Sequence, residues 1–103
     1  EFGLSAEVEI ISPAQAEAYL TNNAHHRKVK QKKVNEYVKD LQEGTWRLNG
    51  KTIVFDANGR LMGGQHRLHA VVQSGKSLTT IVIRGVAPDI LETNPENNVI
   101  IHE

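Results

Sequence analysis

The stretch Leu61-Met62-Gly63-Gly64-Gln65-His66-Arg67-Leu68-His69-Ala70 decides how the rest of this chain is organised. An apolar strand pattern stops at the two glycines, and a helical pattern begins directly after them. Backbone N–H groups at a helix N-terminus point outward and the helix dipole adds partial positive charge, so such a junction suits an anion. The pattern therefore predicts a phosphate site made of five consecutive residues: Gly63, Gly64, Gln65, His66 and Arg67.

The same residues also admit a purely structural interpretation. Two glycines between a strand and a helix are common in tight turns, and an arginine in a first helical turn is often solvated. In the phosphate interpretation, Arg67 supplies a bidentate charged contact and His66 supplies a donor from a ring nitrogen. Both interpretations stay open at the level of the sequence.

The elements on either side of the glycines follow from turn signals and periodicity. The segments Thr52-Ile53-Val54-Phe55 and Arg60-Leu61-Met62 flank Asp56-Ala57-Asn58-Gly59, a turn sequence that predicts a β-hairpin. After the glycines, a stripe made of Leu68, Val71 and Val72 predicts a helix over residues 65–74, ended by Gly75. The β-branched run within residues 77–86 predicts a buried strand.

The first half of the chain predicts a strand and two helices. A strand pattern over residues 8–11 ends at Ser12-Pro13, where serine is a helix N-cap and proline suits the first helical position. This helix is expected to run to about Thr21. Its inward face is expected to hold Ala14, Ala18 and Tyr19. A second, amphipathic helix over residues 31–43 has apolar side chains at i, i+3, i+4 and i+7, namely Val34, Tyr37, Val38 and Leu41.

Together these elements predict an α+β domain, with a small mixed β-sheet covered on one side by about three helices. The chain of 103 residues is expected to form one domain over residues 1–103, with residues 1–6 and 92–103 as loose ends. It contains no cysteine, which excludes disulfides and thiol catalysis. No apolar run approaches the roughly 20 residues of a membrane span, so we expect no membrane partner and a cytoplasmic location.

A net charge of zero hides one basic segment. Residues 1–26 carry four acidic side chains and no Lys or Arg, whereas residues 27–51 carry eight basic and three acidic side chains. Such a segment is either a solvated surface or a contact for a polyanion such as DNA. The candidate DNA-binding side chains are Lys28, Lys30, Lys32 and Lys33. The adjacent His25-His26 pair does not predict a metal site, because neighbours in sequence rarely ligate one ion.

Taken together, the motifs resemble the ParB/sulfiredoxin superfamily, and in particular the small ParB-like domains of phage and bacterial genomes that carry a D-G-Q-H-R motif. The resemblance covers most of the chain and implies a ParB N-terminal/sulfiredoxin-like fold. It runs through these residues and ranges: Arg27, 46–50, 52–56, Gly59, Leu61, 64–70 and 81–86.

The resemblance also implies a ligand. In ParB partition proteins the corresponding turn holds the triphosphate of CTP, and in sulfiredoxin it holds the phosphates of ATP. By position, the resemblance implies that Arg27-Lys28 lie near a nucleotide and that ATP or CTP with Mg²⁺ is the cofactor. It implies that phosphates are held by Gly63, Gly64, His66 and Arg67.

Three departures limit the activity that the resemblance implies. Gln65 stands where sulfiredoxin has its catalytic cysteine, so reduction of a sulfinic acid is excluded. Gly63 stands where the phage-type domains usually have Asp, and the D-x-G-x-R motif that often follows their last strand is not apparent after Pro88. The latter two departures argue against hydrolysis.

Three functions remain open at this stage. The first is a nucleotide-binding module, acting as a switch or a weak NTPase in DNA transactions. The second is a DNA-binding protein or a ParB-like nuclease that uses the basic segment 27–39, with His66 and Gln65 as catalytic candidates. We predict no metal site for such a nuclease. Its candidate carboxylates, on Glu36, Asp40 and Asp56, are separated in sequence. The third is a non-catalytic interaction domain that forms a homodimer through the apolar end at residues 99–101.

Overall fold

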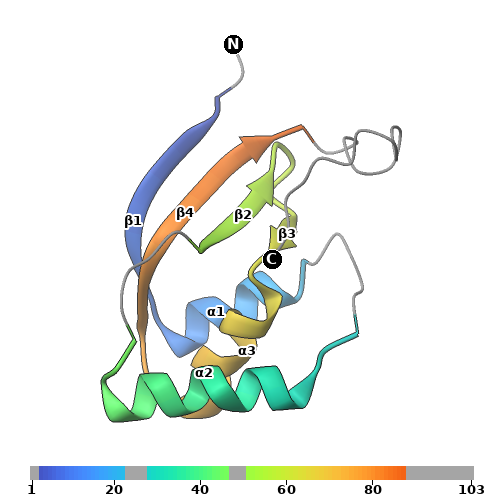
Figure 1. Cartoon of the computed structure of the whole chain (residues 1–103). Coiled ribbons are helices and arrows are strands. Elements are labelled where there is room, and N and C mark those ends of the chain that lie inside the picture. The colour runs from blue at the N-terminus through green and yellow to red at the C-terminus, as the bar shows by residue number, and fades with distance from the viewer. Residues whose placement is uncertain (1–2, 23–27, 47–50, 88–103) are drawn as a thin grey trace.

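The computed structural model describes residues 3–22, 28–46 and 51–87. Within these residues the chain forms four strands and three helices, which confirms the predicted α+β class (Figure 1). In chain order the elements are β1 (Ser5–Ile11), α1 (Pro13–Leu20), α2 (Gln31–Glu43), β2 (Thr52–Asp56), β3 (Leu61–Gly63), α3 (Gln65–Ser74) and β4 (Leu78–Val86).

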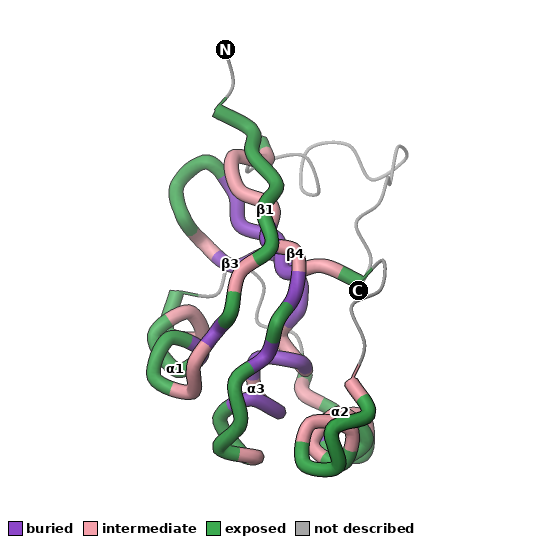
Figure 2. The backbone as a smooth tube through the Cα atoms, turned by 90° about the vertical axis from the view of Figure 1, so that its left-hand side faces the viewer, coloured by how far each residue is buried: buried purple, intermediate pink, exposed green. Residues whose placement is uncertain are grey.

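The sheet is mixed and has the strand order β1-β4-β2-β3. Strand β4 pairs antiparallel with β1 and parallel with β2, and β2 forms the predicted antiparallel hairpin with β3. All three helices lie on the concave side of the curved sheet, as Figure 1 shows. Strand β1 begins three residues earlier than its sequence pattern predicts and is exposed over most of its length (Figure 2).

Local signals in the sequence account for the helix ends. Ser12 and Gln15 form a capping box at the start of α1, and Pro13 occupies its first position. Helices α2 and α3 end at Gly44 and Gly75, both in the left-handed conformation.

The inward face was predicted correctly for α2 and partly wrongly for α1. In α2 the predicted face is confirmed: Val34 is buried, and the other three apolar side chains are partly buried. In α1 the prediction was wrong for the alanines, because Ala16 is buried whereas Ala14 and Ala18 are exposed. The helix has only eight residues and turns Ala16, Tyr19 and Leu20 toward the core, since these lie at i, i+3 and i+4.

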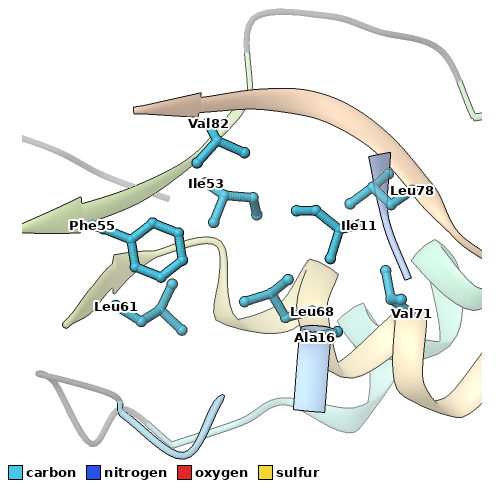
Figure 3. Packing of buried hydrophobic residues seen from close by; sticks show 9 residues of the cluster. All are labelled: Ile11, Ala16, Ile53, Phe55, Leu61, Leu68, Val71, Leu78 and Val82. Atoms are coloured by element: carbon cyan, nitrogen blue, oxygen red, sulfur yellow. The ribbon is translucent and has the colours of Figure 1, made fainter. Parts of the chain in front are cut away.

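The hydrophobic core lies between the sheet and the three helices, as the labelled side chains of Figure 3 show. Trp46 packs against its edge, with its ring centroid 5.7 Å from that of Tyr37. On α3 the buried apolar side chains are Leu68, Ala70 and Val71. The prediction was wrong for Val72, which is 36% exposed. The cluster consists of Ile11, Ala16, Ile53, Phe55, Leu61, Leu68, Val71, Leu78 and Val82.

Several sequence-based expectations fall on residues that the structure does not describe. These are the role of Arg27, the His25-His26 pair and the ends of the chain at residues 92–103, including the apolar segment 99–101 proposed for dimerisation. Among the described residues, no helix is long and apolar enough to cross a membrane.

Candidate functional site

The glycine junction predicted from the sequence connects β3 directly to α3. Gly63 is buried in β3, where it pairs with Val54, and Gly64 is the N-cap of α3 with a φ of 97°. A Cβ atom added to Gly64 would lie 2.3 Å from Ile53 Cδ1 and 3.2 Å from Ile53 Cα. Position 64 therefore requires glycine for two reasons: the backbone is left-handed there, and α3 approaches β2 closely.

The start of α3 presents the positive end of its dipole without any compensating acid. Gly64 has no side chain that caps the helix, and the first turn contains no Asp or Glu. The first regular bond of the helix runs from the Leu68 N–H to the Gly64 carbonyl, at 3.0 Å. Gln65, in this first turn, is partly buried.

His66 joins the start of α3 to the start of α2. Its Nε2 accepts a hydrogen bond from the backbone N–H of Lys30, at 3.1 Å. Lys30 is the N-cap residue of α2, and like Gly64 it makes no side-chain capping bond. Because Nε2 is the acceptor, a neutral His66 carries its proton on Nδ1. The bond brings two helix N-termini and the basic segment together, which the sequence did not predict.

Arg67 points into the protein rather than into solvent. The residue as a whole is only 1% exposed. This burial contradicts the solvated alternative for Arg67. Gln65, His66 and Arg67 all interact with other groups of the protein, and for a buried guanidinium such partners offset the cost of losing water.

Four lysines surround the start of α2. Lys28 and Lys30 precede the helix, and Lys32 and Lys33 lie in its first turn. Lys28, Lys30 and Lys32 are exposed and Lys33 is partly buried. The first turn of α2 also contains no acidic residue. Because the N-terminal end of a helix dipole is positive, these lysines add to positive charge that is already present at the start of α2.

Two of the three acidic residues considered for metal-dependent chemistry, Asp40 and Asp56, have structural roles. Asp40 accepts a hydrogen bond from the Thr45 hydroxyl at the end of α2. Asp56 holds the hairpin turn, since its Oδ1 accepts the backbone N–H groups of Asn58 and Arg60. Among the described residues, no three His, Asp or Glu side chains converge as a metal site would require.

His69 lies one turn after His66 on α3 and is partly buried. Burial lowers the pKa of His69 below its ordinary value of 6.5, because desolvation disfavours the charged imidazolium.

Comparisons of the chain with protein-family models, with curated proteins and with solved structures found no match. The likeness to ParB and sulfiredoxin therefore rests on the sequence motifs alone.

The substitution Gly64→Ala is expected to destabilise the protein more than Gly59→Ala. Both glycines have a positive φ, but a Cβ at Gly59 meets no atom within 4 Å, so this control isolates the backbone cost. We expect Gly59→Ala to lower the free energy of unfolding by about 1–2 kcal/mol and Gly64→Ala by about 1–3 kcal/mol more, because of overpacking against Ile53. Urea unfolding measures both values. Equal losses would contradict the proposed close contact.

The stability of the protein is expected to depend on pH through His69. Because its folded pKa lies below 6.5, the unfolded chain binds more protons as the pH falls through that value. The free energy of unfolding should therefore be highest above pH 6.5 and decrease below it. His69→Gln should make this decrease shallower, measured by urea unfolding between pH 7.5 and 5.5. An unchanged slope in the variant would show that His69 does not contribute.

Proposed function

We propose that this protein binds the phosphates of a nucleotide where the N-termini of α2 and α3 meet. The observation that carries the proposal is the hydrogen bond from the Lys30 N–H to His66 Nε2, at 3.1 Å. This bond connects the predicted phosphate turn at Gly63–Arg67 with the basic segment. One anion thereby comes within reach of two helix dipoles and several lysines.

Electrostatics supports an anion rather than a neutral ligand. Neither helix has an acidic residue in its first turn or a side-chain N-cap. The exposed Lys28 and Lys30 add two cations beside the same helix ends. Repulsion among these groups destabilises the free protein, and a bound phosphate offsets it. The arrangement thus favours a polyphosphate over a single weak anion.

The motif resemblance favours ATP or CTP with Mg²⁺ as the ligand. Binding needs only helix dipoles and cations, whereas hydrolysis also needs an oriented water molecule. We therefore propose a nucleotide-binding module rather than a hydrolase. Gln65 and His66 are the first two residues of α3 at this site.

A DNA-binding function is the second candidate, because Lys28, Lys30 and Lys32 are exposed around the same helix end. These side chains lie at the surface, where a phosphate backbone can reach them. Catalysis on DNA is not part of this proposal, because Asp40 and Asp56 hold local turns.

The nucleotide proposal predicts that lysine substitutions near His66 weaken binding. In calorimetric titrations of ATP, ADP and CTP with Mg²⁺, we expect Lys28→Gln/Lys30→Gln to raise Kd about tenfold, which corresponds to about 1.4 kcal/mol. Lys76→Gln is the control, because this exposed lysine follows the opposite end of α3. Absence of binding to the wild-type protein, or an equal loss in both variants, would contradict the phosphate site.

The DNA candidate predicts a steep salt dependence. If the three exposed lysines contact phosphates, log Kobs should fall against log salt with a slope of roughly −3. Substituting all three by Gln should flatten the slope, measured by fluorescence anisotropy with a labelled duplex. A salt-independent affinity, or no binding at low salt, would exclude this function.

A further inference from the structure

A cavity of about 290 Å³ lies at the hairpin-turn end of β2 and β3. Its lining includes Tyr19 of α1, Phe55 and Asp56 of β2, Arg84 of β4 and the glycines Gly3 and Gly85. The volume is at the lower end of the range for ligand pockets, so it suits a ligand built on a single ring. Nothing in the proposed phosphate site uses these residues.

An irregularity in the sheet lies beside this cavity. Val54 pairs with Ile83 and Asp56 pairs with Val86, so β4 contains one more residue than β2 between the two pairs. Such a bulge changes the direction of nearby side chains. Gly85 lies in it with a φ of 92°, and a Cβ added there would be 2.5 Å from the carbonyl oxygen of Gly3. Gly3 and Gly85 therefore pack closely together where they line the cavity.

The polar side of the cavity is a network around Arg84. The guanidinium donates to both carboxylate oxygens of Glu9, and its Nη2 also donates to the Tyr19 hydroxyl, at 3.2 Å. The hydrogen bond to Glu9 is the main reason that the pKa of Arg84 is raised. A phenol can accept and donate at the same time, so Tyr19 can donate its O–H to a ligand while it accepts from Arg84.

The apolar side of the cavity is aromatic. The Arg84 guanidinium lies over the ring of Phe55, 5.2 Å from its centroid, and the Tyr19 ring meets Phe55 edge-on at 4.8 Å. These contacts hold the three side chains in one fixed arrangement. The cavity therefore presents planar groups beside a hydrogen-bond donor.

The carboxylates near the cavity are already engaged. Glu9 is occupied by Arg84, and both oxygens of Asp56 accept hydrogen bonds within the hairpin, including one from Arg60 Nε at 3.2 Å. Neither ion pair has a net charge. A cationic ligand would be repelled by Arg84 and would find no free carboxylate, and an anionic ligand would have to compete with Glu9.

We infer that the cavity binds a small, uncharged, planar molecule that carries a hydrogen-bond-accepting oxygen, as an aromatic amide does. The ring packs beside Phe55 and Tyr19, and its carbonyl oxygen accepts a hydrogen bond from the Tyr19 hydroxyl. This site is at the turn end of the hairpin, whereas the proposed phosphate site follows the other end of β3. The two sites can therefore be tested separately.

A matched set of probes tests the inference. Benzamide is uncharged and has a carbonyl oxygen, benzoate is anionic, benzamidine is cationic, and toluene has no acceptor. Each is titrated into the ¹⁵N-labelled protein while the amide signals are followed by NMR. We expect benzamide to give saturable shifts at the residues lining the cavity, with a millimolar Kd, and the other three to bind at least fivefold more weakly.

Two tyrosine variants locate the binding. Tyr19→Phe removes the hydroxyl but leaves the pairing of Arg84 with Glu9, so the fold is expected to persist. It should weaken benzamide binding about fivefold, the effect of one net hydrogen bond. Tyr37→Phe is the control, because Tyr37 packs against Trp46 at a different part of the core.

Several results would overturn the inference. These are the absence of saturable shifts at the cavity with benzamide, tighter binding of benzoate than of benzamide, and equal affinity of the wild type and Tyr19→Phe. Shifts confined to residues around His66 would also overturn it. Because benzamide carries no phosphate, each of these results leaves the nucleotide proposal to its own calorimetric test.

Discussion

The close approach of Gly64 to Ile53 is the constraint on which the rest of the structure depends. Ile53 is fully buried in the core, and no side chain fits between it and the first residue of the α3 junction. The left-handed backbone of Gly64 then turns the chain from β3 into α3. Helix α3 consequently packs against both α1 and α2. Its direction determines which of its side chains are buried and which reach the neighbouring helix.

This geometry explains why His66 and Arg67 have different surroundings although they are adjacent. Arg67 is turned into the protein and is almost completely buried, whereas the partly buried His66 reaches the backbone of Lys30. The consequence is a surface where two positive helix ends and several lysines lie close together. At the cavity lined by Tyr19 and Arg84, in contrast, each charge is paired within the protein. The two sites that we propose therefore differ in their electrostatic character.

The sequence predicted the elements well because each has a strong local signal. The capping box at Ser12, the glycine stop at Gly44 and the turn at residues 56–59 all involve neighbours in the chain. The alanine face of α1 was predicted wrongly. Alanines at positions 14, 16 and 18 give no clear helical periodicity, so the sequence does not show which of them is buried, and in the folded protein it is Ala16.

The candidate site was only partly visible in the sequence. The Gly63–Arg67 turn stood out by residue type, but the contact between His66 and Lys30 spans 36 positions and depends on how α2 crosses α3. The cavity was not predicted at all, because its lining residues come from three separate elements and include a bulge in β4. The run of β-branched residues in β4 gave no sign of the bulge, and only Gly85 near its end was a signal that could have indicated it.

The most direct test of the central claim compares ATP with adenosine by NMR, following the backbone amides of Lys30 and of residues 65–68. Phosphate binding at the joined helix N-termini predicts that ATP with Mg²⁺ shifts the amide signals at the starts of both α2 and α3, and that adenosine shifts neither. Identical shifts with both ligands, or shifts that leave these amides unchanged, would contradict a phosphate site at this junction.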